Sequence, residues 1–531
     1  MGRLARLVVF GVPFYAFATV LADSFINWES PHVHPLDLTP DRSRLLAVNT
    51  ADNRLEVFDV GSGLPVHVGS IPVGLDPVSV RARTSREAWV VNHVSDSVSI
   101  VDLTAMNVVK TLATKHEPAD VVFAGAPERA FVSCSQVNEV LVFDPVNLAT
   151  APVAIPIEGE DPRAMAVSPD GTRVFVAIFE SGNRSTILAG AHAPGFFPPD
   201  AVGDLLGPYG GVNPPPNRGA DFDPPRNQAN PPPPPVGLIV RQTGAGRWMD
   251  DNGGDWSDLV SGANASRSGR PTGWELFDHD VAILDAATLG VGYVRHLMNL
   301  CMALAVNPAT GEIAVVGTDA TNEVRFEPNL NGRFLRVEIA LAAPGAAGVP
   351  AIVDLNPHLT YESASVPPAV RALSLGDPRG IVWNAAGTRG YVAGMGSSNV
   401  VVVDAQGRRA GLAPTIVVGA GPTGVVLDEP RRRLFVLDRF DAAISVVDTA
   451  LETEIARIPF FDPTPALIRA GRPHLYDTHA TSGLGHVACA SCHADARVDR
   501  LAWDLGNPAA EMIITSATPS SGRDPAPTGI R

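Results

Sequence analysis

The sequence has little positive charge and lacks long hydrophobic stretches beyond its N-terminus. Its 531 residues include 40 Lys or Arg and 56 Asp or Glu, which gives a net charge of −16. This balance excludes a nucleic-acid-binding protein, because such proteins need a basic surface. After residue 22 no apolar run approaches the ~20 residues of a membrane-spanning helix, so we expect no stable membrane span. The chain also has neither a phosphate-binding glycine loop nor a Ser-His-Asp set in a recognisable local context.

Cysteine is scarce as well. The chain has four cysteines, of which only Cys489 and Cys492 are close in sequence. A four-cysteine zinc site needs a second such pair, and the sequence contains none. Cys134 and Cys301 lie in non-adjacent units of the repeat described below, so we expect two semi-buried free thiols rather than a disulfide.

The N-terminus has the composition of an export signal. Arg3 and Arg6 precede an apolar run over residues 7–21, and small residues follow. This order is typical of a secretory signal peptide, here spanning residues 1–22. An uncleaved membrane anchor is the alternative, but the run is about 15 residues long and falls short of a full span. We therefore expect the mature protein in the periplasm or otherwise outside the cytoplasm.

Glycine and proline, in contrast, are plentiful, with 49 and 48 residues, and they indicate many turns and short strands. A hydrophobic strand that ends in an acidic residue recurs along the chain, and four of the six intervals are 42 to 44 residues long. The acidic residues are Asp59, Asp102, Asp144, Asp285, Glu327, Asp404 and Asp448. Because they recur with the repeat, we expect them to accept hydrogen bonds from turns rather than to catalyse a reaction.

Each repeat contains further strands. A second apolar run precedes most of the acid-terminated strands by five or six residues, and another strand and turn precede that run. Units of about 42 residues with four short strands are typical of a β-propeller, because one such sheet cannot bury both of its faces alone. The predicted fold class is therefore all-β, with a seven-bladed β-propeller over residues 34–461.

Two insertions interrupt this pattern. The first, at about residues 184–280, lies between the second and third strands of the fourth blade. The second, at about residues 345–376, lies between the fifth and sixth blades. Strands alternate in direction within a blade, so we expect both insertions and the segment after residue 461 to emerge on one face of the disc, where insertions in repeat proteins often form the functional surface.

The first insertion contains a cluster of oxygen-bearing side chains. They are Asp250, Asp251, Asn252, Asp255 and Asp258. Oxygen ligands separated by glycines suit Ca²⁺, but the spacing differs from that of an EF-hand loop. Turn and capping roles are the favoured interpretation, and a Ca²⁺ site is the alternative.

The repeats resemble the YVTN family of β-propeller repeats. That family is named for a second-strand consensus, which the stretches AVNT at 47–50 and VVNH at 90–93 match loosely. The resemblance covers roughly residues 34–461 and implies a propeller. The fold does not by itself select a function, because propellers have many unrelated activities.

The stretch CASCH, from Cys489 to His493, has the clearest chemistry. C-x-x-C-H is the attachment signature of a c-type haem. It predicts that Cys489 and Cys492 bond to the haem and that His493 is the proximal ligand of the iron. A redox dithiol or half of a zinc site is the alternative. Haem is attached outside the bacterial cytoplasm, so the predicted export signal favours the haem interpretation.

The residues around CASCH resemble the electron-transfer haem module of the di-haem cytochrome c peroxidase group. The stretch LYDTHATSGLGHVACASCH matches the pattern of that module in order, including Leu475, Asp477, Ser482 and Gly485. Together with the repeats, the chain resembles exported YVTN-propeller proteins fused to a cytochrome c domain. The resemblance implies a covalently bound haem c and a short, mostly α-helical domain after the propeller.

The chain also departs from the peroxidase pattern. It has a single CxxCH, whereas a di-haem enzyme needs two, and 38 residues follow His493. We therefore expect a partial, apparently truncated haem domain over residues 462–512 and a disordered tail over 513–531. Within that domain, the apolar residues and the glycine of residues 463–471 predict a short helix.

The sequence does not select the distal ligand of the iron. Met512 is the only methionine after CASCH and is one candidate. His479 and His486, upstream of the motif, are two others. An open or water-bound position is the remaining alternative.

These features predict an exported haem protein that exchanges electrons with a redox partner protein, with the propeller as a docking scaffold. An oxidoreductase or peroxidase-like enzyme is one alternative. A propeller that binds a partner, with a vestigial haem segment, is another.

Overall fold

The computed structural model describes residues 26, 28–190, 199–212, 227–229, 237–320, 335–345, 349–361, 363, 365–410, 413–497, 513–514 and 529–530. The predicted signal peptide and the candidate ligand Met512 lie outside the described residues. No helix among the described residues is long and apolar enough to cross a membrane.

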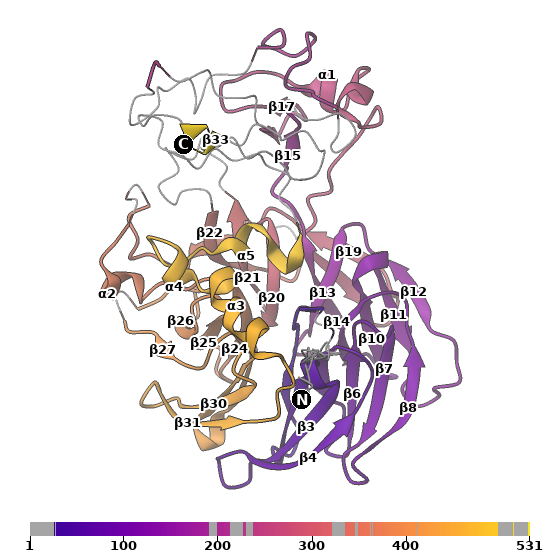
Figure 1. Cartoon of the computed structure of the whole chain (residues 1–531). Coiled ribbons are helices and arrows are strands. Elements are labelled where there is room, and N and C mark those ends of the chain that lie inside the picture. The colour runs from indigo at the N-terminus through magenta and orange to yellow at the C-terminus, as the bar shows by residue number, and fades with distance from the viewer. Residues whose placement is uncertain are drawn as a thin grey trace, which may run out of the picture.

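The described residues form seven four-stranded antiparallel sheets, which fan out around one axis in Figure 1. The first three sheets contain β1 (Leu36–Leu38), β2 (Arg44–Asn49), β3 (Arg54–Asp59) and β4 (Val66–Pro72); β5 (Pro77–Ala82), β6 (Glu87–Asn92), β7 (Ser97–Asp102) and β8 (Asn107–Ala113); and β9 (Pro118–Ala124), β10 (Arg129–Cys134), β11 (Glu139–Phe143) and β12 (Val153–Pro156). The fourth contains β13 (Glu160–Val167), β14 (Arg173–Glu180), β18 (Val281–Asp285) and β19 (Val291–Val294). The last three contain β20 (Leu300–Val306), β21 (Ile313–Ala320), β22 (Leu335–Ala342) and β23 (Ala351–Asp354); β24 (Pro378–Trp383), β25 (Arg389–Gly394), β26 (Asn399–Asp404) and β27 (Ile416–Val417); and β28 (Pro422–Asp428), β29 (Arg433–Asp438), β30 (Ala443–Asp448) and β31 (Thr453–Pro459).

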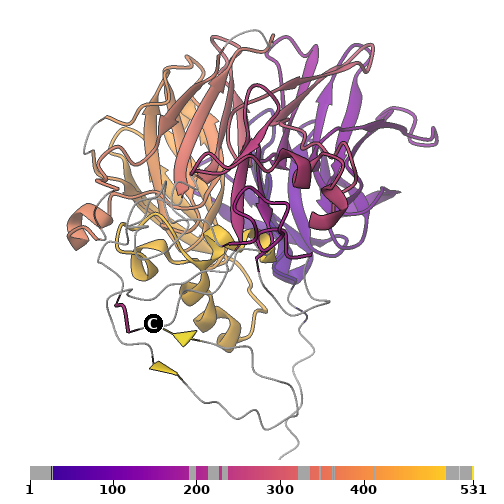
Figure 2. The same cartoon turned by 90° about the horizontal axis from the view of Figure 1, so that it is seen from above.

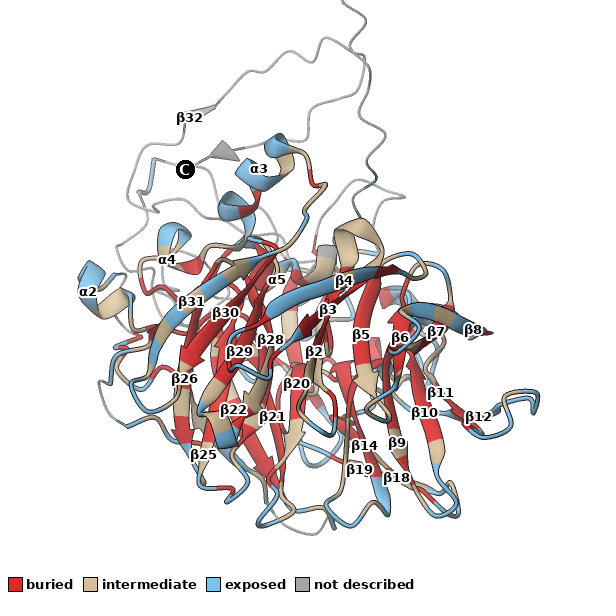
Figure 3. Cartoon of the chain, turned by 90° about the horizontal axis from the view of Figure 1, so that it is seen from below, coloured by how far each residue is buried: buried red, intermediate tan, exposed pale blue. Residues whose placement is uncertain are grey.

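The first strands of the seven sheets form a closed ring around the axis. In chain order β1, β5, β9, β13, β20, β24 and β28 each contact the next, and β28 contacts β1. Each sheet is covered by its neighbours, as when Trp89 and Ile100 of the second sheet pack with Val121 and Val132 of the third. Figure 3 shows the result: the interior of the disc is buried, while outer strands such as β4 and β8 are largely exposed. The protein is a β-propeller.

The acidic residues at the ends of the third strands serve the turns, as expected. The carboxylate of Asp102 accepts hydrogen bonds from the backbone nitrogens of Thr104 (2.7 Å) and Ala105 (2.9 Å), which lower its pKa. The same kind of turn bond is made by Asp59, Asp144, Asp285, Asp404 and Asp448. Glu327 lies outside the described residues.

The fifth sheet differs from the predicted strand pattern. Its third strand is β22, and its fourth strand, β23, lies inside the predicted insertion at 345–376. The alternating pattern of LRVEIALA in β22, buried on one face against the sixth sheet, explains why this stretch joins the sheet. The connection between the fifth and sixth sheets therefore begins after Asp354 and contains the helix α2 (Pro368–Arg371).

The first insertion contains its own small sheet. This sheet consists of β15 (Ser185–Leu188), β16 (Leu238–Gln242) and β17 (Trp248–Met249), followed by α1 (Ser257–Val260) and a 3-10 turn (Ala265–Ser268). Trp248 and Trp256 are buried in a separate core there. The insertion leaves the propeller after β14 and projects beyond its rim (Figure 1).

Short helices follow the last sheet. They are α3 (Ala466–Tyr476), α4 (Thr478–Thr481), α5 (Cys489–Cys492) and a 3-10 turn at Ala494–Ala496. They lie together along one face of the propeller in Figure 2. The helix α3 continues past Gly471, where we expected it to end, because its Arg472 and Tyr476 are anchored on the propeller, as described below. The rest of the chain is described only at β32 (Ile513–Ile514), which pairs with β33 (Gly529–Ile530).

An acidic pair sits on the fifth sheet. Glu338 of β22 is directly opposite Asp354 of β23. Burial, together with the charges of Asp319 and Asp354, raises the pKa of Glu338 to about 8 from an ordinary value of 4.5. The folded protein therefore binds a proton that the unfolded chain has lost between these two pH values, so stability falls as the pH rises through this window.

We expect the Glu338→Gln variant to lose less thermal stability than the wild type between about pH 5 and pH 9, because it removes this titration. Unfolding temperatures measured across this range test the expectation. The matched control is Glu312→Gln, whose carboxylate bonds to Thr310 in a turn and whose curve should follow the wild type. A wild-type pH profile unchanged by Glu338→Gln would contradict the prediction.

Candidate functional site

The CASCH motif lies on one face of the propeller, and buried residues within and just before it pack against the sheets. Its two cysteines occupy the first and last positions of the single-turn helix α5, and the backbone nitrogen of Ala488 donates to Ser491 Oγ (3.0 Å) at its start. Ala490 and Ser491 are buried, and the preceding Val487 packs into the core between the fifth and sixth sheets. Neither cysteine is in a disulfide; Cys489 is exposed and Cys492 is half-buried. The two cysteines of the motif are thus available for covalent attachment on one short helical turn.

His493 is exposed and ends this helical turn. Its Nδ1 lies 3.2 Å from the carbonyl oxygen of Arg497. A carbonyl only accepts hydrogen bonds, so Nδ1 is the donor and Nε2 carries the free lone pair. Histidines that bind metals are commonly oriented by such a bond from the second ring nitrogen.

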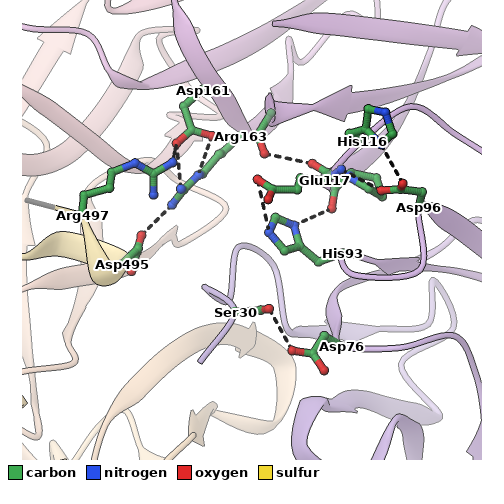
Figure 4. Close-up of polar contacts among 12 residues, drawn as sticks. Ser30, Asp76, His93, Asp96, His116, Glu117, Asp161, Arg163, Asp495 and Arg497 are labelled. Carbon is green, nitrogen blue, oxygen red and sulfur yellow. Dashed lines mark hydrogen bonds and ion pairs between the residues drawn. The ribbon is translucent and has the colours of Figure 1, made fainter. Parts of the chain in front are cut away.

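A buried ion cluster anchors the turn that follows. Two residues after His493, the carboxylate of Asp495 lies 2.6 Å from Arg163 Nη1 and 3.1 Å from Arg379 Nη1. Arg163 is also bound by Asp161 (3.1 and 2.8 Å) and Arg379 by Asp377 (2.8 Å). Burial by itself would raise the pKa of Asp495, but Arg379 and Arg163 hold it well below its usual range. Figure 4 shows the part of this cluster around Arg163.

The two arginines come from two sheets of the ring that are separated by the fifth sheet. Arg163 belongs to β13 of the fourth sheet and Arg379 to β24 of the sixth, each near the start of its strand. Both stand in the tripeptide Asp-Pro-Arg, in which the aspartate has a positive φ, 70° at Asp161 and 50° at Asp377. Our sequence interpretation missed these residues. The sequence did contain a signal for them, because the tripeptide Asp-Pro-Arg occurs at the start of the first strand in both of these repeats.

A third arginine extends the cluster. Arg497 forms ion pairs with Asp161 and with Glu180 at the end of β14. The guanidinium groups of Arg163, Arg379 and Arg497 lie 3.8, 5.8 and 5.6 Å from the centre of the buried Phe179 ring. Ala494 packs against the same ring. The residues after His493 are therefore attached to the fourth and sixth sheets at once.

The upstream histidines differ in their surroundings. His479 has its Nε2 within 3.0 Å of the carbonyl oxygen of Ser374. His486 is buried, its ring meets Tyr361 edge-on at 5.5 Å, and neither of its nitrogens has a hydrogen-bond partner among the described residues. Burial lowers the pKa of His486 to about 4. Within the described part of the chain, neither ring stacks on His493 or hydrogen-bonds to it, so the structure does not join these candidate distal ligands to the proximal one.

The helix α3 lies beside the motif and contacts α5. Arg472 of α3 is buried and bound to Glu29 (3.0 Å), and Tyr476 packs on Phe440 at 4.8 Å, which sets the rotation of the helix. The neighbouring face carries Leu467 and Leu475, which are 85% and 41% exposed. Between them, Gly471 has open space where a side chain would be.

The acidic cluster of the first insertion is engaged in local hydrogen bonds. Asp250 accepts from Trp256 Nε1 (2.9 Å) and from Tyr209 Oη (3.1 Å). Asp255 accepts from Ser257, and Asp258 from Asn264. Among the described residues no group of three or more His, Cys, Asp or Glu side chains is placed to hold a metal ion. These contacts match the turn and capping interpretation, and Ca²⁺ stays an untested alternative.

The remaining cysteines are free and fully buried. Cys134 ends β10 and Cys301 lies in β20, and burial raises the pKa of both thiols. Such thiols resist ionisation, and only the thiolate is reactive. The reactive sulfur chemistry of the described residues is thus concentrated in CASCH.

The donor set at CASCH suits a covalently attached c-type haem. Two cysteines on one helical turn that form no disulfide, and a histidine whose Nδ1 is held by a carbonyl so that Nε2 points elsewhere, are groups that such a haem needs. The residues that would hold it are Cys489, Cys492 and His493.

No protein-family model matches the sequence, and a search of curated proteins finds no match. Solved propeller structures are similar to it. Hydrazine synthase from Kuenenia stuttgartiensis matches with a TM-score of 0.52 and 16% identity over 82% of this chain and 99% of that chain. Dihydro-heme d1 dehydrogenase NirN in complex with DHE matches with a TM-score of 0.40 and 10% identity, over 82% of this chain and 68% of that chain. Apo AztD from Citrobacter koseri matches with a TM-score of 0.39 and 9% identity, over 79% of this chain and 95% of that chain. At such identities the likeness concerns the fold alone, and the first of these supports the β-propeller.

We expect Asp495→Ala to loosen the segment from Thr478 to Arg497. Each arginine keeps its own aspartate, so the cost should be about 1.5 to 3 kcal/mol, as for hydrogen bonds to charged groups, rather than the larger cost of an orphaned buried charge. Hydrogen exchange of the backbone amides in this segment measures the effect.

The matched control for this variant is Asp441→Ala, which removes a carboxylate paired with Arg457 at the surface (3.1 Å). A surface pair typically contributes about 0 to 1 kcal/mol. Equal protection of the segment in both variants would show that the buried cluster does not anchor it.

Proposed function

We propose that this protein is an exported c-type haem protein that transfers electrons, built as a seven-bladed propeller that carries one haem segment. The observation that carries the proposal is the geometry of CASCH: two cysteines on one turn that form no disulfide, and a histidine whose Nδ1 is held by the Arg497 carbonyl at 3.2 Å. The resemblance of the sequence to YVTN-propeller proteins fused to a cytochrome c domain supports it.

Each residue of the motif has a distinct role in this proposal. Cys489 and Cys492 would hold the haem covalently, each thiol adding across one vinyl group with its sulfur on one carbon and its hydrogen on the other, so that no atom is lost. The Nε2 of His493 would ligate the iron, and the Nδ1 hydrogen bond to the Arg497 carbonyl holds the ring in a fixed orientation. When bound, the haem supplies a one-electron couple.

The propeller positions the haem segment in this proposal. The Asp495 cluster ties the chain just after His493 to the fourth and sixth sheets, and Val487 ties the chain before it to the fifth and sixth. A haem on this turn has a fixed place over one face of the disc. A redox partner protein can then approach the same face repeatedly in one orientation, which suits electron transfer outside the cytoplasm.

A peroxidase-like oxidoreductase is the second candidate. An iron with an open sixth position can bind peroxide, whereas a doubly ligated iron serves electron transfer. Absorption spectra with and without peroxide separate the two: a low-spin spectrum unchanged by peroxide supports electron transfer.

We expect protein expressed with its own signal sequence to retain haem after denaturation, detected by haem staining of a denaturing gel and by reduced-minus-oxidised spectra. The variant Cys489→Ser, Cys492→Ser should lose the stain, because no thioether can form. Cys134→Ala, a matched change at a buried thiol in β10, should keep it. His493→Ala should keep some stain but alter the spectrum. Absence of stain in the wild type would refute the proposal.

The exposed face of α3 provides a second test. If Leu467 and Leu475 cover the haem, replacing both with Ser admits water, so we expect a shifted Soret band and a more negative midpoint potential. Leu451→Ser, a change at an exposed leucine in the turn before β31, is the control and should leave both unchanged. Identical spectra and potentials in the two variants would mean that this face does not contact the haem.

A further inference from the structure

The ring of His493 depends on a single polar contact. His493 is exposed at the end of α5, and its Nδ1 lies 3.2 Å from the carbonyl oxygen of Arg497. Within the described part of the chain, this is the one hydrogen bond that the ring makes. The orientation of the ring, and with it the direction of Nε2, therefore follows the position of the Arg497 carbonyl group.

The main chain supports only one side of that carbonyl group. The backbone nitrogen of Arg497 donates to the carbonyl oxygen of Ala494 at 3.1 Å, which closes a tight turn. Within this turn Asp495 has a left-handed φ of 50° and is bound by Arg163 and Arg379. These contacts fix the first half of the turn, whereas the acceptor for His493 lies at its end and needs an anchor of its own.

The side chain of Arg497 provides this anchor. Its Nη2 pairs with Asp161 and its Nε with Glu180. The fully buried Phe179 ring lies 5.6 Å from the guanidinium group. All three partners belong to the fourth sheet, Asp161 to β13 and the other two to β14. A single sheet of the propeller thus holds the residue that orients His493.

Asp161 is a well-fixed partner in this arrangement. It is buried, and its carboxylate accepts from Arg163 Nε (3.1 Å) and Nη2 (2.8 Å). Its backbone nitrogen donates to Asn138 Oδ1 at 2.9 Å. Figure 4 shows Arg497 and Arg163 converging on this carboxylate. Supporting groups position a ligand well only when their own places are locked by further contacts, and Asp161 meets that condition.

We propose that Arg497 is a positioning residue for the proximal histidine. Its side chain, held by Asp161 and Glu180, places its carbonyl group so that His493 Nδ1 donates to it and Nε2 stays free for the iron. This role rests on the proposed function, because it concerns the ligand of the haem. A hydrogen bond from the second ring nitrogen raises the basicity of a histidine ligand. A more basic ligand stabilises ferric iron, so this contact lowers the reduction potential.

The tautomer of His493 tests the proposal without haem. Nitrogen-15 NMR of the histidine-labelled full chain, produced in the cytoplasm so that no haem is attached, measures it at about pH 8.5, where an ordinary histidine is neutral. The His493→Ala variant identifies the signal. We expect Nδ1–H to dominate in the wild type. Arg497→Met should lower the ratio of Nδ1–H to Nε2–H by about twofold to tenfold, as for the loss of a typical hydrogen bond.

A second variant and a matched control accompany this measurement. Glu180→Gln removes one of the two ion pairs and should lower the ratio less. Arg457 of β31 is 39% exposed and also pairs with two carboxylates, Glu454 (2.8 Å) and Asp441 (3.1 Å), so Arg457→Met should leave the ratio unchanged. Dominant Nε2–H in the wild type, or an equal ratio in both arginine variants, would overturn the proposal. If Arg497→Met fails to fold, the wild type and Glu180→Gln decide.

The reduction potential tests the same role in the haem-loaded protein. Arg497→Lys keeps the charge, but an ammonium group cannot hold two carboxylates in the forked geometry of a guanidinium. We expect a more positive midpoint potential with unchanged haem staining, and no shift for Arg457→Lys. A retained stain with an unshifted potential in Arg497→Lys would overturn the positioning role and leave the proposed function intact. Absence of stain in the wild type would refute the proposed function, and the tautomer ratios then decide the role of Arg497.

Discussion

The mutual burial of neighbouring sheets is the constraint on which the rest of this structure depends. A four-stranded sheet with two apolar faces has no stable isolated form, so each sheet needs a neighbour on either side. The contact of β28 with β1 closes the series. Closure brings the starts of seven inner strands around one axis, and residues distant in sequence become neighbours there. Arg163 and Arg379 can bind one carboxylate for this reason alone.

This convergence also determines the electrostatics of the axis. At one end, the buried Arg163 and Arg379 each have their own aspartate, and both also bind Asp495. Arg497 adds a third positive charge to this cluster. A carboxylate placed two residues after His493 thereby attaches the motif to the disc without a large apolar interface. At the other end, Arg81 pairs with the buried Asp120 at 3.6 Å and donates to the Met165 carbonyl at 3.2 Å. The two ends of one axis thus offer two different chemical environments.

Much of the fold follows from local pattern. Six of the seven repeated acidic residues end the third strand of a sheet or directly follow it. Their carboxylates accept hydrogen bonds from the turn that comes next. The fifth sheet shows the limit of such reasoning, because the stretch LRVEIALA has no acidic end and joins the sheet through its buried alternate face. The helix α3 shows a second limit. Gly471 favours an end by propensity, but the anchors at Arg472 and Tyr476 lie beyond it and outweigh that preference.

The sequence by itself determined the strand period and the residues of CASCH, because turn chemistry and C-x-x-C-H spacing are properties of neighbouring residues. Only the tertiary structure decided which groups meet the motif: the carbonyl that orients His493, the arginines that bind Asp495 and the helix that lies beside the thiols. It alone also decided that Arg497 pairs with Asp161 and Glu180. These are contacts between distant residues, and they depend on how the ring closes rather than on any local preference.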